Sequence, residues 1–486
     1  MDARPGSDQP LNAQAQLAAA QQARVSQRVP GRPQRWNTRA VVPRRPPDEL
    51  APVSFGQEQI WLHGQLAPLV PLYTESLTIR RTGPLDTDAF VTSFREIVRR
   101  HEIWRTTFVW ARDQLVQAVH PDLQPRLRVA DLRHLPQQAR EASALQLALE
   151  DLRAPFELSR EPGVRALLVT LSDSDHRLFL CLHHMVFDGV SIYRVFLSEL
   201  AALYEAKVRG TPCVLGDLPL QYADFAYWQR RTIGEAAWAP LIEYWRTQLS
   251  GVSALLELPA DRPRPPSQSF RGGLVRFDFP GDLAAAARST ALRENCTLFM
   301  LLLASFAVTL HRWSGQTDML IGSVSSGRDH SELEPLIGYF MRMLVIRTDV
   351  RGNPTFREIL RRVRDVVLDA LCHDVLPFQR LVQAAVHERD LSRNPLFQVT
   401  LSIEPPKPPV GPQWDISELD AGVVASKFDL SVELEDRGDV MRGRAIYSRD
   451  LFEAATISEL VGDWLLLLGR AVADPGQRLS QLVNSR

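Results

Sequence analysis

The chain has 486 residues, of which 45% are hydrophobic and 23% are charged, so it is long enough for two hydrophobic cores. Its formal net charge of −1 provides no overall attraction to nucleic acid or to an anionic membrane, and we expect neither as a partner. It contains no run of about 18 apolar residues and no secretory signal at its N-terminus, so we expect a cytoplasmic protein. Its four cysteines are far apart and form no Cys-x-x-Cys pair, which argues against a zinc site and against a disulfide framework.

Residues 1–48 differ in composition from the rest of the chain. They contain eight arginines and three aspartates, and five prolines lie between residues 30 and 47. Alanine and glutamine favour a helix over Leu11–Val29, and the proline-rich part is typical of an extended linker with a short strand over Arg35–Val42. The segment is expected to be either a disordered tail or a docking segment for a partner.

From residue 49 onward the pattern of apolar residues is that of a globular α+β protein. Before residue 259 it predicts, in chain order, a helix over Leu85–Thr106, strands over Leu127–Val129, Arg165–Leu171 and Arg177–His183, and a helix over Ser191–Leu203. A stiff connector is predicted over Pro259–Pro266. After it come a strand over Leu274–Phe279, a helix over Leu298–Trp313, strands over Met319–Val324 and Leu344–Val350, a helix over Phe356–Leu371, strands over Val399–Ile403 and Leu430–Leu434, and a helix over Ile457–Val472. The expected division is an N-terminal lobe at 49–230 and a C-terminal lobe at 231–486.

The segment His183–Gly189 is the strongest candidate for chemistry. It joins a predicted buried strand to a predicted helix, so the imidazole of His184 should lie near the free backbone N–H groups of a helix start. An imidazole there can take or position a proton, and the free amides can stabilise an oxyanion. Gly189, which has no side chain, would let an acyl group approach the backbone.

Other interpretations of the same segment stay open at this point. A histidine at a strand end is often a hydrogen-bonded core residue, and Asp188-Gly189 is also a common turn. No third ligand at metal-binding spacing lies near His184, and no Gly-x-Ser-x-Gly segment indicates a serine nucleophile. The sequence has no Gly-rich phosphate loop, which argues against activation by ATP.

His183-His184-x-x-x-Asp188-Gly189 resembles the signature of the condensation domains of nonribosomal peptide synthesis, which have the chloramphenicol-acetyltransferase-like fold. Six further segments are similar to motifs of that family in the same order. They are Ser54–Trp61, Arg100–Phe108, Tyr222–Gln229, Ile337–Phe340, His373–Phe378 and Arg389–Gln398. The resemblance therefore covers most of the chain.

The resemblance implies two lobes arranged as a V, with a tunnel between them. The donor would be a thioester on the phosphopantetheine of a separate carrier protein, and the chain itself would bind no cofactor. His184 would be the catalytic histidine, together with His183, Asp188 and Gly189, and Ser191 would contact substrate. Arg328, which lies in a segment similar to the family's Ser-Gly-Arg, is the expected partner of Asp188.

The implied reaction transfers the acyl group to an amine or a hydroxyl, with amide or ester formation and chain release as outcomes. A thioester is already activated, so His184 needs only to accept or position the proton of the nucleophile. The pathway would be nonribosomal peptide or hybrid polyketide biosynthesis. The alternatives are a non-catalytic carrier-binding scaffold and an acyltransferase of the same superfamily that uses acyl-CoA.

Phe340-Met341-Arg342 departs from the family's Phe-Val-Asn. A guanidinium is well suited to carboxylates and phosphates, so Arg342 is a candidate substrate-binding residue for an acidic group on the acceptor. An ion-paired or exposed arginine is the alternative. The sequence shows no carrier or adenylation segment, so we expect carrier proteins to act in trans and to dock on the basic residues 1–48.

Overall fold

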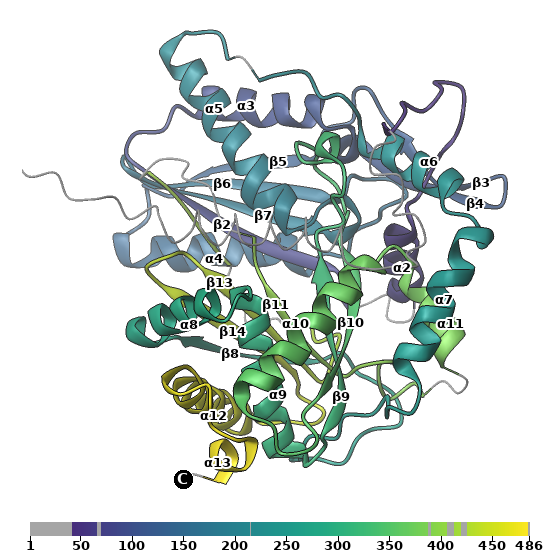
Figure 1. The fold of residues 1–486 in the computed structure, drawn as a ribbon. Helices are drawn as coiled ribbons and strands as arrows, with labels where there is room; N and C mark the ends of the chain where they lie inside the picture. Colours follow the sequence, from purple (N-terminus) through teal and green to yellow (C-terminus); the bar gives the residue numbers. More distant parts are fainter. Residues whose placement is uncertain are drawn as a thin grey trace, which may run out of the picture.

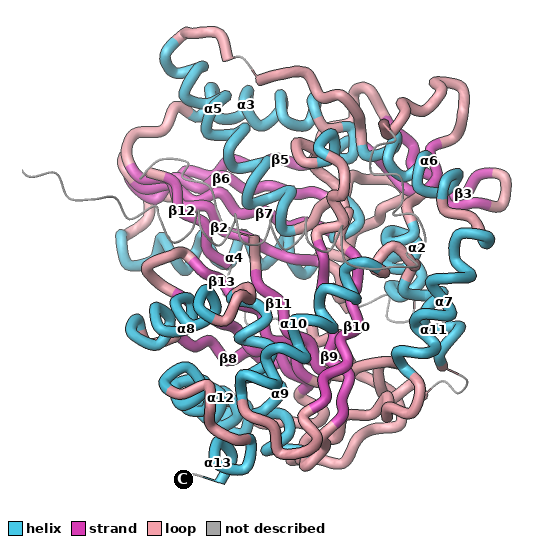
Figure 2. The backbone as a smooth tube through the Cα atoms, viewed as in Figure 1, coloured by secondary structure: helices cyan, strands magenta, loops and turns pink. Residues whose placement is uncertain are grey.

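The computed structural model describes residues 41–65, 70–213, 215–386, 390–405, 413–418 and 425–484. Helices and strands are mixed throughout, and two large sheets form the centres of two lobes (Figure 1). Figure 2 shows the two sheets as an upper and a lower group of strands, each with helices packed beside it. The predicted α+β class with two lobes is confirmed.

The first lobe is built on a mixed sheet of five strands in the order β12-β2-β7-β6-β5. Its strands are β2 (Thr74–Thr82), β5 (Arg126–Asp131), β6 (Val164–Ser172), β7 (Asp175–His183) and β12 (Trp414–Glu418), and its helices are α3 (Thr87–Arg100), α4 (Gln137–Arg153) and α5 (Leu197–Arg209). Leu178 and Leu180 of β7 belong to the core that includes α3 and α5, whereas Phe179 packs in a smaller core with α4. Because both faces of β7 are covered, its sequence is a continuous apolar run.

Two helices of this lobe differ from their predicted extents. Helix α3 begins at Thr87 after the N-cap Asp86, whose carboxylate accepts the N–H of Ala89 at 2.9 Å, and it ends at Arg100 rather than Thr106. His101 has extended backbone there, and a 3-10 turn follows over Glu102–Arg105. The helix predicted from Ser191 begins as a π-helical segment, Ser191–Phe196, before α5 continues it.

The second lobe is built on a sheet of six strands in the order β10-β9-β11-β13-β14-β8. Its strands are β8 (Gly272–Asp278), β9 (Asp318–Ser325), β10 (Arg342–Asp349), β11 (Val399–Ile403), β13 (Leu430–Asp436) and β14 (Met441–Ser448). Its helices are α8 (Gly281–Arg293), α9 (Leu298–Ser314), α10 (Phe356–Cys372), α12 (Ala454–Ala473) and α13 (Leu479–Asn484). The predicted strand β11 and the predicted helices α9 and α10 are confirmed to within one residue.

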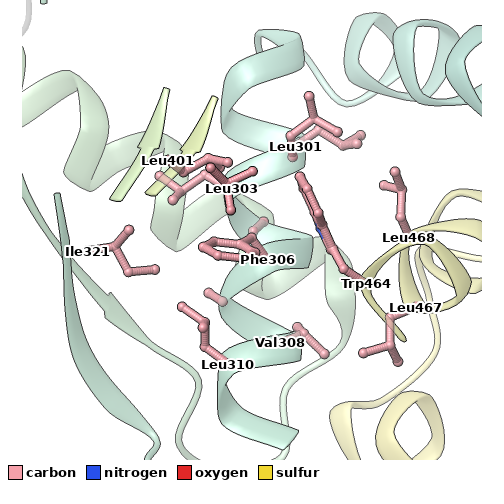
Figure 3. Close-up of a cluster of buried hydrophobic side chains, with 14 of the residues drawn as sticks. Leu301, Leu303, Phe306, Val308, Leu310, Ile321, Leu401, Trp464, Leu467 and Leu468 are labelled. Carbon is pink, nitrogen blue, oxygen red and sulfur yellow. The ribbon is translucent and has the colours of Figure 1, made fainter. Parts of the chain in front are cut away.

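Helix α9 is the centre of the second core (Figure 3). Phe306 of α9 and Trp464 of α12 lie close together, with ring centroids 5.1 Å apart. The indole N–H of Trp464 donates to the Ser305 hydroxyl at 2.9 Å, so its polar atom is satisfied inside the core. Among the described helices none is long and apolar enough to cross a membrane alone; α8 and α9 pass that test only as a pair bent by 109°.

A small sheet and four helices lie beside the two lobes. The sheet has the order β1-β4-β3, with β1 (Ala51–Pro52), β3 (Thr106–Ala111) and β4 (Gln114–Val119); the helices are α2 (Phe55–Gly64), α6 (Tyr222–Thr232), α7 (Glu235–Leu249) and α11 (Phe378–Ala385). Helix α2 begins with a capping box, in which Ser54 and Gln57 satisfy each other's backbone N–H groups. The Gln57 amide also donates to the carbonyl of Met185 at 2.8 Å, which fixes the turn after β7.

The first described residues correct the expected end of the basic tail. Val42 is 1% exposed in the first core, the side chain of Arg44 donates to the carbonyl of Pro219, and the N–H of Arg45 donates to Asp224. Residues 41–48 are therefore part of the folded body. The helix predicted over Leu11–Val29 and nearly all of the strand predicted over Arg35–Val42 lie outside the described residues.

Strand β12 joins the two halves of the chain. It follows the second-lobe strand β11 in sequence but pairs antiparallel with β2 of the first sheet, with Ile416 opposite Ile79. The part of the chain after residue 231 thus contributes a strand to the first lobe. The division at residue 230 remains a prediction.

Asp188 and Arg328 form a buried ion pair between the lobes. The Arg328 Nη2 lies 3.0 Å from Asp188 Oδ1, and the two side chains are 1% and 3% exposed. Asp188 also accepts the N–H groups of Ser191 and Phe340, and Arg328 donates to the carbonyl of Leu336. The contact expected between Asp188 and Arg328 is therefore present, and hydrogen bonds from both lobes surround it.

Replacement of Asp188 by alanine should lower the free energy of unfolding by about 3–5 kcal/mol, because Arg328 would stay buried without its counter-ion. Chemical denaturation followed by circular dichroism measures this loss. The matched control is Glu96→Ala, which breaks the exposed 2.6 Å pair with Arg99 and should cost about 1 kcal/mol or less. Equal losses in the two variants would contradict the role of the buried pair.

Candidate active site

A cavity of about 300 Å³ lies between the lobes, and His184 is one of its lining residues. A second cavity of about 180 Å³ shares Glu75, Lys427 and Arg444 with it, and a third of about 40 Å³ shares Tyr339. The three cavities are therefore neighbours, and His184 lines the largest of them. A cavity between the lobes, as the predicted tunnel requires, is present at the imidazole.

The backbone turn after β7 fixes the ring of His184. The N–H of His184 donates to the carbonyl of Tyr73 at 2.8 Å, and its ring stacks on that of Phe187 with centroids 4.6 Å apart and planes 3° apart. Tyr339, from the segment before β10, meets the ring edge-on at 5.9 Å. Residues from both lobes therefore hold the imidazole in one orientation, with 7% of the residue exposed.

Glu75 of β2 is the polar partner of His184. The Nε2 of His184 lies 2.6 Å from Glu75 Oε1, whereas its Nδ1 is buried and has no hydrogen-bond partner among the described residues. Burial would raise the pKa of Glu75, but His184, Lys427 and Arg444 outweigh burial and hold that pKa well below its usual range. The carboxylate is thus ionised at cellular pH and accepts the Nε2–H of the ring.

More charged side chains line the same cavity as His184. The ammonium of Lys427 lies 4.7 Å from the centre of the Tyr73 ring, and Arg444 of β14 is hydrogen-bonded to Glu433 of β13. Glu404, just after β11, lies 3.8 Å from Arg444. These residues come from the second lobe, so the second lobe supplies most of the charge that faces the imidazole.

Gly189 lines the cavity, as expected, but the space beside it is not left open. A Cβ at this position would lie 3.0 Å from Glu404 Oε2 and 3.4 Å from Pro405 Cδ. A carboxylate of the second lobe therefore approaches the backbone closely at this position. A side chain at residue 189 would require Glu404 to move by a few tenths of an ångström.

His183 was expected to be catalytic, and that role remains a prediction. Its side chain is absent from the lining of the His184 cavity, and its Nδ1 accepts the N–H of Met185 at 3.3 Å. Burial, with smaller contributions from His184 and Lys427, lowers the pKa of His183 to about 3. The ring is therefore neutral at cellular pH and supports the turn that presents His184.

Ser191 was expected to bind substrate, and this prediction is corrected. The residue is 0% exposed, and its hydroxyl lies 2.7 Å from Asp188 Oδ1, 2.9 Å from the Gly338 carbonyl and 3.0 Å from Arg328. All of these contacts are part of the hydrogen-bond network that joins the two lobes. The hydroxyl therefore has a structural role, because residues of the chain itself already occupy its hydrogen-bonding positions.

Arg342 was expected to receive an acidic group of the acceptor. Its Nη1 instead lies 2.7 Å from Asp329 Oδ2 and 3.1 Å from Asp374 Oδ1, and its Nη2 donates to the carbonyl of Gly327. Two carboxylates around one guanidinium leave a net negative charge, which disfavours a third carboxylate. Arg342 is therefore an ion-paired arginine, which was the alternative to substrate binding.

Glu75, Glu404, Lys427 and Arg444 were not identified from the sequence. Glu75 lies on the same face of β2 as the buried Leu77 and Ile79, and a carboxylate at such an inward position needs a polar partner. That pattern was a usable signal. The described residues contain no group of three or more His, Cys, Asp or Glu side chains arranged to hold a metal ion.

Comparison with known proteins identifies the family. The family model described as "Condensation domain" matches residues 48–485. The chain is 42% identical over 454 residues to phosphinothricin tripeptide synthetase PhsC of Streptomyces viridochromogenes, which covers 91% of this chain and 41% of that protein. It is 38% identical over 439 residues to chondramide synthase cmdD of Chondromyces crocatus, covering 90% and 11%. The chain thus spans less than half the length of either relative.

Solved structures resemble the whole two-lobed body. The X-domain from teicoplanin biosynthesis has a TM-score of 0.78 at 29% identity, with 91% of this chain and 99% of that chain covered. The SgcC5 protein from Streptomyces globisporus has a TM-score of 0.71 at 27% identity, with 88% and 100% covered. The chain therefore belongs to the condensation-domain family of nonribosomal peptide synthesis and has its chloramphenicol-acetyltransferase-like fold.

Proposed function

We propose that this chain transfers an acyl group from the phosphopantetheine thioester of a carrier protein to the amino group of an acceptor, forming an amide. The observation that carries the proposal is the position of His184, whose fixed ring lines a cavity between two lobes. Membership of the condensation-domain family supports the reaction class. The cavity supports delivery of the two substrates to the imidazole from separate carriers.

The reaction needs only proton handling and positioning. The acceptor nitrogen attacks the thioester carbonyl, the C–N bond forms, and the C–S bond then breaks to release a thiol. The His184–Glu75 pair accepts or positions the proton that leaves the nitrogen, a contribution of roughly 10²–10⁴ in rate. Holding donor and acceptor at one point of the cavity contributes as much or more.

The structure also helps to rank the alternatives. A carrier-binding scaffold does not need an imidazole paired with an ionised carboxylate inside a cavity, so catalysis explains Glu75 better than binding alone. Mass spectrometry of an acyl-loaded carrier, with and without this protein, tests the proposal. Acyl transfer to an amine supports the proposal, whereas an unchanged carrier would favour the alternative of a non-catalytic carrier-binding scaffold. Transfer only from acyl-CoA would contradict the proposed donor. Transfer only to alcohols would contradict the proposed acceptor.

Replacement of His184 by alanine should lower the rate of amide formation by roughly 10²–10⁴-fold, because the proton-handling pair is lost while the cavity remains. Single-turnover transfer from a loaded carrier measures the rate. The control is His134→Ala, which removes an exposed imidazole and should leave the rate unchanged. A His184→Ala protein with the wild-type rate would overturn the assignment.

Deletion of residues 1–40 tests the basic tail, which lies outside the described residues, as a docking segment. The cut is placed at residue 40 because Val42 and Arg45 are part of the folded body. The apparent KM for a carrier-bound donor should rise several-fold, since electrostatic steering is lost, while that for a small thioester should not change. An unchanged KM for the carrier would exclude docking on the tail.

Replacement of Arg342 by alanine should lower the free energy of unfolding by about 1–3 kcal/mol, because the buried Asp374 loses a partner. Its effect on rate should be the same for acceptors with and without a carboxylate. Paired kinetic assays with two such acceptors check this. A loss confined to the acidic acceptor would restore the original hypothesis that Arg342 recognises it.

A further inference from the structure

Glu75 lies beside His184 in the lining of the cavity between the lobes. Its carboxylate lines both of the larger cavities, and its side chain remains 39% exposed although it lies inside the protein. The Nε2 of His184, held 2.6 Å away, is the ring nitrogen that faces the carboxylate. An acceptor that reaches the imidazole through the cavity therefore meets the carboxylate as well.

The hydrogen bonding determines which group has a free lone pair. With Glu75 ionised, the Nε2–H of His184 points to the carboxylate, and the other ring nitrogen is Nδ1. That atom is buried and has no partner among the described residues. Within the pair, the lone pairs that face the cavity belong to Glu75.

The surrounding charges leave Glu75 available for a cation. Arg444 is engaged by Glu433 and Glu404, and Lys427 lies over the ring of Tyr73. Among the described residues, His184 is the one side chain within hydrogen-bond distance of the Glu75 carboxylate. The ionised carboxylate of Glu75 thus has acceptor capacity left for the N–H groups of an incoming ammonium ion.

We propose that Glu75 is a further catalytic residue, whose carboxylate binds the acceptor as an ammonium ion and accepts its proton while His184 keeps the carboxylate in place. The inference rests on the proposed acyl transfer. It assigns the acceptor class as a basic amine, and it assigns proton acceptance to the carboxylate and positioning to the imidazole.

The protons and bonds balance as follows. The ammonium gives one proton to Glu75, which passes it to water in the cavity, and the neutral nitrogen attacks the thioester carbon. The C–N bond forms, and the nitrogen gives a second proton to the regenerated carboxylate. When the C–S bond breaks, its electron pair goes to sulfur, which takes that second proton and leaves as the thiol.

The test compares two small acceptors of equal shape, propylamine and O-ethylhydroxylamine, with an acyl-pantetheine thioester as donor at pH 7. The first is an ammonium ion at this pH, and the second is neutral. Glu75→Gln should lower the rate with propylamine by roughly 100-fold or more, and the rate with O-ethylhydroxylamine by less than about tenfold. Because glutamine is isosteric, the bond from His184 Nε2–H is retained, and thermal unfolding verifies the fold.

A pH series provides a second readout. The neutral fraction of propylamine rises roughly tenfold per pH unit below its pKa, so the Glu75→Gln rate should recover as the pH rises from 7 to 9. The wild-type rate should rise much less. Glu75→Asp, which keeps a carboxylate, should retain the preference for propylamine.

Three other results would contradict either the role of Glu75 or the proposed acyl transfer. Equal losses with both acceptors, or no loss, would overturn the role of Glu75. The same selective loss in Glu404→Gln, which removes a different carboxylate of this cavity, would also overturn it, since a general field would then explain the effect. Wild-type protein that transfers acyl groups to neither acceptor nor to a carrier-bound amine would instead refute the proposed function.

Discussion

The buried ion pair of Asp188 and Arg328 is the contact on which the geometry of the candidate site depends. It joins the turn that follows β7 to the segment that follows β9, and the cavity exists only because those two segments face each other. Removing two charges from water offsets much of their attraction, so the pair need not add much net stability. Its contribution is a fixed distance between the lobes, which the hydrogen bonds of Ser191 reinforce.

That distance determines what the imidazole can meet. The first lobe supplies His184 and Glu75, and the second lobe supplies Glu404, Lys427 and the edge of Tyr339. A shift of one lobe would separate the two sets of charges, and the balance around Glu75 would change. The position of the second lobe therefore affects the pKa of Glu75, and the connecting network of Asp188, Ser191 and Arg328 that fixes this position is buried.

The sequence predicted elements with strong local patterns and residues within recognisable motifs. The run Arg177–His183 was identified as a buried strand because helices cover both of its faces, and Arg328 was identified as the partner of Asp188 through its motif. Glu75 was missed because its partner is 109 positions away in the chain. Ser191 was misassigned, and the ion pairs of Arg342 were not foreseen, because residue type shows what a side chain can bind but not which partners the fold already provides.

The pairing of His184 with Glu75 also explains a requirement of amide formation that the imidazole alone does not meet. A basic amine reaches the cavity mostly as an ammonium ion, which has no lone pair and cannot attack a carbonyl. The imidazole provides no negative charge to hold that ion, whereas an ionised carboxylate attracts it and can accept its proton. A hydroxyl acceptor carries no charge and gains little from Glu75. The same carboxylate would therefore activate the nitrogen nucleophile and discriminate against oxygen nucleophiles.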